Sequence, residues 1–386
     1  RITKETSAAG VSTTYRYDKN GNLTSVTDGR GNTTTYTYDA ENKLTKVTTA
    51  EGLITELVYD AAGRLVRAVN ANGHAMSLRY DADGSAVGMT DGLDNATAYT
   101  YDALGRITAW TNPDGTARSY TYDANGNLLA VTDERGSTTA YTYDAEDRLL
   151  TVTDPEGGVT TYTYTAAGQT ASVKDRNGAV TAYTYDGNHN VTSVTDGRGN
   201  TTAYEYDRLN RLTAAVDPEG GRTEYAYDEN GNLTSVTMPE GGTYGSAYDS
   251  ADRKTSETDA LGHAEAYTYD ENGNVTSVTN RRGHTTGYAY DKDNRLISVT
   301  DALGGVTSYT YDGLGQVTSI TNALGAVTTT EYDANGQPVT ESNELAESGS
   351  DTHRVKYEYD SRGFVTRRTG EDGTSVSYEY DENGNV

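Results

Sequence analysis

The sequence contains no cysteine, one tryptophan, one phenylalanine and five prolines among its 386 residues. Without cysteine, disulfides and thiolate metal sites are excluded. Hydrophobic residues make up only 34% of the chain, which excludes a large core of leucine, isoleucine and phenylalanine. The aromatic residues are almost all tyrosine, 33 in number, so tyrosine must supply most of the apolar surface.

Positive charge is also scarce, because 31 Lys and Arg stand against 57 Asp and Glu and give a formal net charge of -26. Nucleic-acid-binding proteins need clustered basic residues that release counterions, so we expect no nucleic-acid partner. No apolar run is long enough for a membrane helix and no signal-like segment stands at Arg1, so we expect no membrane insertion.

What the chain does contain is a repeat of 21 residues, marked by a tyrosine that is usually followed by aspartate. One longer step of 27 residues separates Tyr332 from Tyr359. A second tyrosine stands two residues before the marker in fourteen repeats, and this strict register argues against a disordered acidic chain. The markers define eighteen repeats: Tyr17, Tyr38, Tyr59, Tyr80, Tyr101, Tyr122, Tyr143, Tyr164, Tyr185, Tyr206, Tyr227, Tyr248, Tyr269, Tyr290, Tyr311, Tyr332, Tyr359 and Tyr380.

Each repeat reads as two strands and two turns. Runs such as residues 33–38 alternate threonine with tyrosine, which favours a strand with both rings on one face. A turn such as Asp228 to Gly231 follows, with glycine where a left-handed conformation is needed. A second strand and a similar second turn, such as Asp154 to Gly157, complete the repeat. Because 21 is odd, side-chain alternation must be reset once per repeat, and we predict a β-bulge between Leu128 and Val131 and at the equivalent places.

The residues that carry this signature are expected to be structural. With the bulge, both tyrosines, the leucine and the valine of a repeat share one face of the sheet. The clearest signature positions are Tyr36, Tyr38, Asp39, Tyr120, Tyr122, Asp123, Gly126, Tyr141, Tyr143, Asp144, Tyr183, Tyr185, Asp186, Tyr225, Tyr227, Asp228, Gly231, Tyr267, Tyr269, Asp270, Gly273, Tyr309, Tyr311 and Asp312.

These hairpins predict an all-β fold, a long antiparallel sheet of roughly thirty-six strands. An open twisted sheet normally sustains only about ten strands, so the ribbon must curl. We expect a spiral, either a hollow shell or solenoid-like, in which turns at one margin meet turns of the next winding.

The array is expected to span residues 1–386 as one domain, regular over 1–342. The segment 343–353 reads as a polar, exposed insertion, and the last two repeats occupy 354–386. The repeats at Tyr248 and Tyr332 are degraded: the first carries Ser246, Lys254 and Glu257 at apolar positions, and the second carries Thr330, Pro338 and Glu341. We expect them to be weak points.

The pattern Gly-x-x-x-x-Tyr-x-Tyr-Asp, as at Gly136 to Asp144, resembles the YD or Rhs repeat family over essentially the whole chain. The resemblance implies a spiralling sheet that encloses a hollow shell, as in bacterial Rhs toxins, the cocoon of insecticidal ABC toxins and animal teneurins. In the toxins the shell shields a C-terminal effector, preceded by a self-cleaving segment. This sequence contains neither, so we expect it to be a segment of a larger protein.

The sequence offers no recognisable chemistry, and we expect no catalytic, cofactor or metal site. The histidines His74, His189, His263, His284 and His353 are spread rather than clustered and read as solvated turn residues. Asp-rich turns do not follow the spacing of calcium loops, although calcium between neighbouring turns stays an open alternative. Trp110 reads as core filling, and Arg30 and Arg198 as solvated turn residues.

The sequence is compatible with two functions. The first is an encapsulating or scaffolding shell of a secreted or cell-surface bacterial protein, with a cargo or other domains of the parent chain as partners. The second is a surface adhesin or stalk that binds carbohydrate or protein through exposed tyrosine rings. Burial of the paired tyrosines favours the shell, and solvent-exposed rows of rings favour the adhesin. The sequence does not determine which face lines an interior.

Overall fold

The computed structural model describes residues 1–344 and 352–386, and every regular element in these ranges is a β-strand. Thirty-six strands form one sheet, in which each strand pairs antiparallel with the next strand of the sequence. The all-β hairpin array that the tyrosine spacing predicted is therefore confirmed.

Each repeat supplies one strand before its turn at the marker tyrosine and one after it. The strands before the turn are β2 (Ser12–Tyr17), β4 (Thr33–Tyr38), β6 (Ile54–Tyr59), β8 (Ala75–Tyr80), β10 (Ala96–Tyr101), β12 (Ala117–Tyr122), β14 (Thr138–Tyr143), β16 (Val159–Tyr164), β18 (Val180–Tyr185), β20 (Thr201–Tyr206), β22 (Arg222–Tyr227), β24 (Thr243–Tyr248), β26 (Ala264–Tyr269), β28 (Thr285–Tyr290), β30 (Val306–Tyr311), β32 (Val327–Tyr332), β34 (Thr352–Tyr359) and β36 (Ser375–Ser377). The others are β1 (Lys4–Thr6), β3 (Leu23–Thr27), β5 (Leu44–Thr48), β7 (Leu65–Val69), β9 (Ala86–Thr90), β11 (Ile107–Thr111), β13 (Leu128–Thr132), β15 (Leu149–Thr153), β17 (Thr170–Lys174), β19 (Val191–Thr195), β21 (Leu212–Val216), β23 (Leu233–Thr237), β25 (Lys254–Thr258), β27 (Val275–Thr279), β29 (Leu296–Thr300), β31 (Val317–Thr321), β33 (Pro338–Glu344) and β35 (Val365–Thr369).

The turn that follows the marker tyrosine, here called the YD turn, has the expected geometry. In the Asp228 turn, the Gly231 N–H donates to the Asp228 carbonyl at 3.2 Å, and Gly231 has φ 94°. The Asp228 carboxylate accepts the backbone N–H of Asn232 at 2.8 Å. Where the glycine of a YD turn is replaced, the substitutes with positive φ are the residue types that tolerate it best: Asn42, Asp147, His189, Asn210, Asp252 and Asn294.

The predicted β-bulge is present in the second strand of each complete hairpin. In the β12–β13 pair, Thr121 lies opposite Ala130 and Tyr122 lies opposite Leu128, so Leu129 is the extra residue. The same register shift precedes every marker tyrosine from Tyr17 to Tyr359. Both tyrosines, the leucine and the valine of a repeat consequently share one face, which we call the tyrosine face.

The sheet is a single layer without a conventional core. Ala214 is the one hydrophobic residue of the described ranges that is fully buried. The paired tyrosines are half-buried, and Tyr244, outside these pairs, is the exposed tyrosine at 44%. Stability therefore comes mainly from contacts between neighbouring strands on the tyrosine face, which add up from repeat to repeat.

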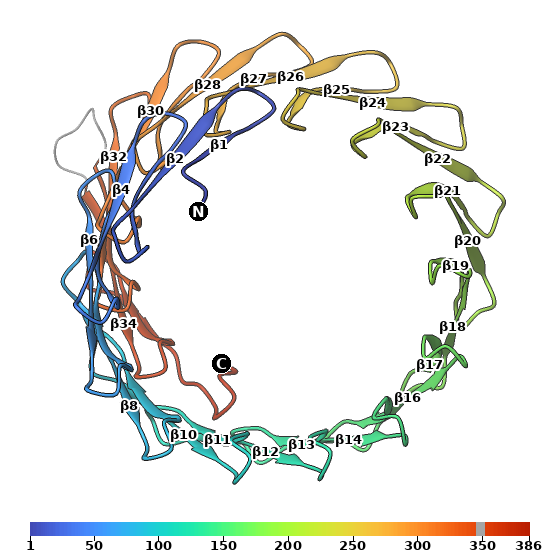
Figure 1. Cartoon of the computed structure of the whole chain (residues 1–386), viewed down its shortest axis with the longest axis horizontal. Coiled ribbons are helices and arrows are strands. Elements are labelled where there is room, and N and C mark those ends of the chain that lie inside the picture. Colours follow the sequence, from blue (N-terminus) through green and yellow to red (C-terminus); the bar gives the residue numbers. More distant parts are fainter. Residues whose placement is uncertain (345–351) are drawn as a thin grey trace.

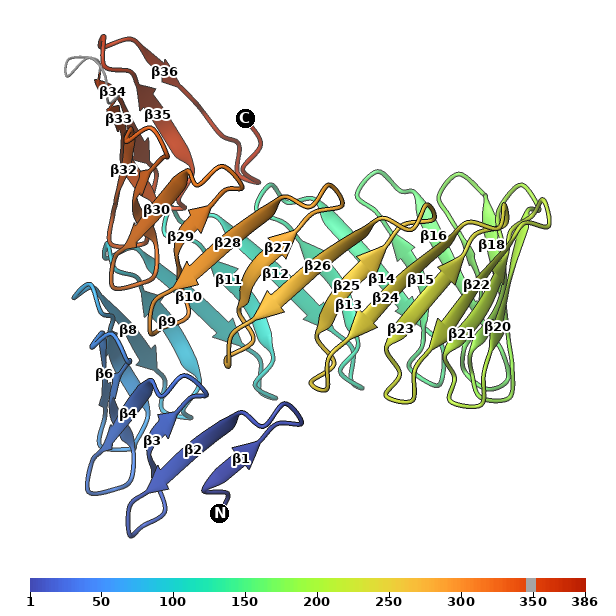
Figure 2. The same ribbon diagram turned by 90° about the horizontal axis from the view of Figure 1, so that it is seen from above.

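The ribbon winds into a spiral. Figure 1 shows the sheet curving into a ring around a central space that holds no strand, with both termini on its inner side. Figure 2 shows that the strands from β28 onward rise over those near the N-terminus instead of meeting them edge to edge. The expected spiral, in which turns of one winding meet turns of the next, is confirmed by the contacts described below.

The polar insertion is shorter at both ends than expected. Strands β33 and β34 extend beyond the usual hairpin, and Asn343 pairs with His353 and Glu344 with Thr352. These four residues were expected in a loop, but their backbones continue the ladder. The rest of the expected loop, residues 345–351, lies outside the described residues.

Candidate functional site at the seam between windings

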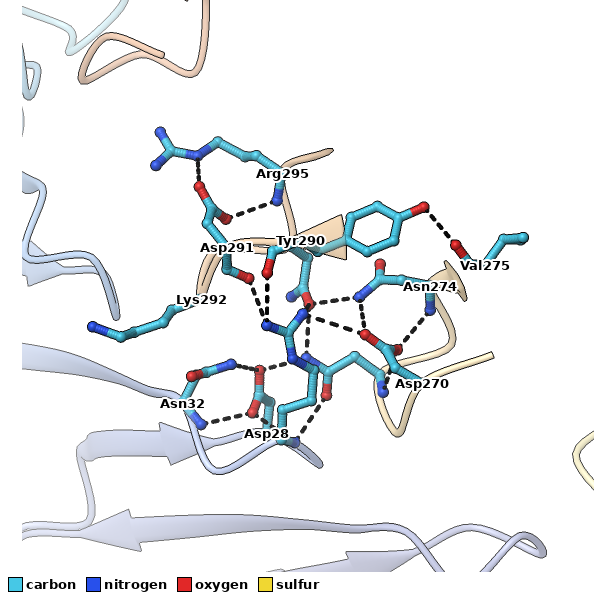
Figure 3. Close-up of polar contacts among 12 residues, drawn as sticks. Asp28, Asn32, Asp270, Asn274, Val275, Tyr290, Asp291, Lys292 and Arg295 are labelled. Atoms are coloured by element: carbon cyan, nitrogen blue, oxygen red, sulfur yellow. Dashed lines mark hydrogen bonds and ion pairs between the residues drawn. The ribbon is translucent and has the colours of Figure 1, made fainter. Parts of the chain in front are cut away.

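Turns from two windings meet along a seam, where Asp28 and Asn32 of one winding lie beside Asp270 and Asp291 of the next (Figure 3). The guanidinium of Arg30 lies 3.3 Å from the Asp270 carboxylate and donates to the carbonyls of Tyr290 at 3.2 Å and Asp291 at 2.8 Å. Beside it, the Asn272 amide donates to the Asp28 carboxylate at 2.6 Å. The turn that contains Asp28 and Arg30 thus contacts two consecutive YD turns of the next winding.

Five further repeats also place a turn of one winding against a YD turn of the next, through different side chains and different turn positions. In three of them an amide meets a carboxylate, and in the other two a hydroxyl or a guanidinium does. The pairs are Thr49 with Asp293 at 2.7 Å, Asn72 with Asp312 at 2.9 Å, Asn335 with Asp91 at 2.6 Å, Arg362 with Asp114 at 2.8 Å, and Asn383 with Asp133 at 2.6 Å.

The seam keeps a register of twelve repeats per winding. The repeat of Tyr17 touches the repeat of Tyr269, and the repeat of Tyr122 touches that of Tyr380, which is twelve markers further along in both cases. The sequence separation rises from 244 residues for the first contact to 250 for the last. The difference is the six residues added by the insertion. The number of repeats per winding therefore stays constant, whereas the number of residues does not.

Close backbone approach accompanies these hydrogen bonds. Gly313, the second residue of a YD turn, donates its N–H to the Asn72 side chain at 2.8 Å. A Cβ atom at Gly313 would lie 2.6 Å from that side chain and 2.9 Å from the backbone of Ala71. Gly187 holds the equivalent place in a YD turn without a winding beside it, and a Cβ there meets nothing within 4 Å.

Consecutive repeats are joined by the marker tyrosines. In all eighteen repeats the hydroxyl donates to a backbone carbonyl of the preceding repeat, as Tyr143 does to Leu128 at 2.9 Å. The β13–β14 ladder pairs only residues 130–132 with 138–140, which stops short of Leu128. The tyrosine hydroxyl therefore satisfies a carbonyl that the bulge leaves without a strand partner.

The fifth residue of the YD turn makes a second link to the following repeat. Arg106 donates to its own Asp102 at 2.7 Å and to the Asp123 carbonyl at 3.0 Å, and it stacks on the Tyr122 ring at 4.6 Å. In other repeats an asparagine takes this place. The Asn127 amide donates to the carboxylate of Asp147 in the next turn at 2.7 Å.

These contacts favour ionised aspartates. The pKa of Asp228 is held below its ordinary value, chiefly by the hydrogen bond from the Asn232 side chain. The pKa of Asp144 is lowered in the same way, chiefly by Arg148. These two turns are thus most stable with their carboxylates charged.

The degraded repeat at Tyr248 carries a polar cluster on the tyrosine face. Lys254 lies opposite Tyr248 and forms an ion pair with Glu257 at 2.9 Å. Glu257 also lies opposite Glu265 of the next strand, and the Tyr267 hydroxyl donates to Glu265. An ion-pair network replaces the usual leucine and valine here.

The sequence-predicted signature residues lie along the sheet rather than in one place. Their tyrosines occupy strand ends, and their aspartates and glycines form the YD turns. The winding brings only Asp270 and Asp312 among them to the seam. A seam of turns was expected, but the residues that form it were missed, because they are ordinary turn residues whose partners lie about 240 residues away.

Two expectations about single residues were wrong. Arg30 was expected in solvent, but its side chain is only 20% exposed because the next winding covers it. Trp110 was expected to fill a core, but it is 46% exposed because the sheet has one layer. Arg198 is exposed, as expected.

The described residues show no group of three or more His, Cys, Asp or Glu side chains placed to hold a metal ion. The turn carboxylates accept protein hydrogen bonds; that of Asp270, for example, accepts the backbone N–H groups of Asn272 and Asn274. No helix capable of crossing a membrane occurs in residues 1–344 or 352–386.

Comparison with known proteins identifies this repeat. The RHS Repeat family matches residues 1–75, 80–348 and 352–386 in overlapping segments. No curated protein matches the chain.

Several solved structures share the fold. A crystal structure of TcdB2-TccC3-TEV has a TM-score of 0.72 at 16% identity, over 94% of this chain and 25% of that one. TcdB2-TccC3 without its hypervariable C-terminal region has a TM-score of 0.66 at 17% identity, over 98% and 22%. The Photorhabdus luminescens Tc holotoxin pore, with a TccC3 mutation, has a TM-score of 0.64 at 15% identity, over 96% and 26%. The chain thus spans about a quarter of the length of each of these three solved chains.

Proposed function

Because the chain belongs to the RHS repeat family, we propose that it forms part of the wall of a hollow shell that encloses another polypeptide segment. The observation that carries this proposal is the seam. Six successive contacts hold one winding against the next, so that a ribbon one layer thick becomes a continuous wall around a central space.

The role is structural rather than catalytic. A wall separates an interior from solvent, and an acidic, polar surface solvates an enclosed chain without offering it an apolar surface to adhere to. The solved TcdB2-TccC3 neighbours support this role, since one of them was determined without a hypervariable C-terminal region. By analogy, the enclosed segment would belong to the same parent protein, secreted by or displayed on a bacterial cell.

The adhesin alternative gains no support from the tyrosines. It requires rows of exposed rings, whereas the paired tyrosines of the described strands are half-buried and their marker hydroxyls are bound to backbone carbonyls. The signature residues would then stabilise the sheet that forms the wall.

Electron microscopy of the whole protein that carries this array tests the proposal. We expect a hollow body with a thin wall and additional density inside it. A solid rod, or an array that stays unwound, would contradict the shell.

A further inference from the structure

The asparagines that donate hydrogen bonds across the seam in the described structure are all followed by glycine. Each one donates its side-chain amide to a carboxylate of the other winding, at 2.6 to 2.9 Å. Each is the third residue of its turn, and the glycine with positive φ is the fourth. The turn requires this glycine, and the seam uses the amide beside it. The four dipeptides are Asn72-Gly73, Asn272-Gly273, Asn335-Gly336 and Asn383-Gly384.

Asparagine before glycine is prone to spontaneous loss of its side-chain amide, because glycine has no side chain to shield its backbone nitrogen. That nitrogen gives up its proton and attacks the side-chain Cγ of the asparagine. The Cγ–Nδ2 bond breaks, ammonia leaves with the proton, and a succinimide ring forms. Water then opens the ring and yields aspartate or isoaspartate. One water is consumed and one ammonia is released, with no oxidation or reduction.

The product of this reaction does not fit the closed seam. The Asn335 amide lies 2.6 Å from the Asp91 carboxylate, so deamidation would bring two carboxylates together. Burial raises the pKa of Asp91, but hydrogen bonds that include those from Asn95 and Asn335 lower it below its ordinary value, so Asp91 is charged. The two turns are also in close contact, since a Cβ at Gly92 would lie 2.5 Å from the Ala334 carbonyl oxygen. The repelling carboxylates can therefore separate only if the windings separate.

The contact between Asn383 and Asp133 has the same weakness. The Asn383 amide donates to Asp133 at 2.6 Å, and the Asn383 side-chain oxygen is buried without a hydrogen-bond partner in the described residues. Deamidation replaces the donor by a second acceptor and leaves a buried carboxylate without a donor for that oxygen. Burial of such a charge is unfavourable, so this contact would also open.

From these observations we propose that the four seam asparagines are deamidation sites, and that their deamidation irreversibly releases one winding from the next. In the closed turn the glycine N–H donates to the carbonyl of the first turn residue, at 3.1 Å for both Gly273 and Gly336. The nitrogen is therefore engaged, and the reaction proceeds from turns that loosen transiently. This inference goes beyond the shell function, because it concerns how the wall opens and holds whatever the wall encloses.

Ageing of the full chain in mildly alkaline buffer tests the reaction, with peptide mass spectrometry to locate aspartate and isoaspartate and small-angle X-ray scattering to follow the spiral. Asn177 is the internal control, because it also precedes glycine in a turn of the same kind but is exposed. We expect the radius of gyration to rise as the seam asparagines convert, and conversion of Asn177 alone to leave it unchanged. Seam asparagines that stay intact after Asn177 has fully converted, or that convert without a change in scattering, would overturn the proposal.

Variants that carry the product test its effect directly. The triple variant Asn272→Asp, Asn335→Asp and Asn383→Asp should have a larger radius of gyration and a lower melting temperature, with the strand signal in circular dichroism retained. The matched control adds the same charge in exposed turns and should keep the closed spiral: Asn20→Asp, Asn177→Asp and Asn188→Asp.

A charge swap separates repulsion from simple loss of the asparagines. Adding Asp28→Asn, Asp91→Asn and Asp133→Asn to the first triple variant restores an amide opposite each carboxylate and should close the spiral again. Asparagine is tolerated at this place, since Asn70 caps its turn through the same backbone N–H groups. A first triple variant that stays closed, a control that opens equally, or a swap that stays open would refute the proposal.

Discussion

Arg30 and Arg198 occupy the same place in two turns of identical sequence, Asp-Gly-Arg-Gly-Asn, yet only Arg30 is covered by another winding. Arg30 binds the Asp270 carboxylate and two carbonyls of the following hairpin. Local sequence therefore sets the shape of the turn, whereas the winding decides whether its arginine is a contact residue.

This pair gives the most direct test of the seam. Arg30→Ala should lower the free energy of unfolding by about 2 kcal/mol or more, because several charge-assisted hydrogen bonds are lost and the Asp270 carboxylate loses its cation. Arg198→Ala should change it by less than about 0.5 kcal/mol. Chemical unfolding followed by circular dichroism measures both, and equal effects would contradict the seam.

Gly313 and Gly187 form a second matched pair. Gly313→Ala should widen the seam and lower the melting temperature, because the new Cβ meets the backbone of Ala71 and the side chain of Asn72. Gly187→Ala should be neutral or slightly stabilising, because its Cβ meets open space and the unfolded chain loses entropy. Small-angle X-ray scattering and thermal melts of the two variants check this, and an intact, equally stable spiral for Gly313→Ala would count against it.

The marker tyrosine hydroxyls should contribute to stability repeat by repeat. Tyr143→Phe leaves the Leu128 carbonyl without its donor and should cost about 1 kcal/mol. Tyr141→Phe serves as the control, because Tyr141 lies on the same strand and its hydroxyl makes no protein hydrogen bond in the described structure. Denaturant unfolding distinguishes the two, and a similar cost for both would show that the bulge carbonyl is not what the hydroxyl satisfies.

Lys254 and Glu257 interrupt the tyrosine face. Replacing both by the usual residues, Lys254→Leu with Glu257→Val, should raise stability by about 1 kcal/mol, because apolar side chains replace a half-exposed ion pair. Lys254→Leu alone should destabilise the chain, because Glu257 then faces Glu265 without its nearest cation. Calorimetry of the single and double variants measures the difference, and a stabilising single variant would contradict this account.

Acid should weaken the turns. The pKa values of Asp228 and Asp144 are lower in the folded chain, so their contribution to stability is complete above the unfolded value of about 3.9. It is lost as the pH falls through the lower folded values. Melting temperatures at falling pH should decline in this window even in high salt, which screens long-range charge but leaves short hydrogen bonds. A melting temperature that stays constant down to the lowest pH would contradict the role of the turn carboxylates.

Most of the local structure could be predicted from the sequence, because it repeats. The spacing of Tyr120, Tyr122, Leu128 and Val131 determined the strands, the shared face and the bulge by parity alone. The partner of a given turn could not be predicted, because it depends on twist and curvature summed over twelve repeats. Trp110 was misjudged for a related reason, since a single-layer sheet offers no core for a large ring to fill.

Because the number of repeats per winding is constant, insertions and losses of whole repeats affect such an array differently. Residues added at a hairpin tip, such as the six beyond the regular period, leave every seam partner in place. Loss of one whole repeat from the uncovered stretch would shift all later turns by one partner, so that Asp293 would face Asp28 instead of Thr49 and two carboxylates would meet. Short insertions are therefore expected to be silent, whereas gain or loss of a repeat requires compensating changes along the whole seam.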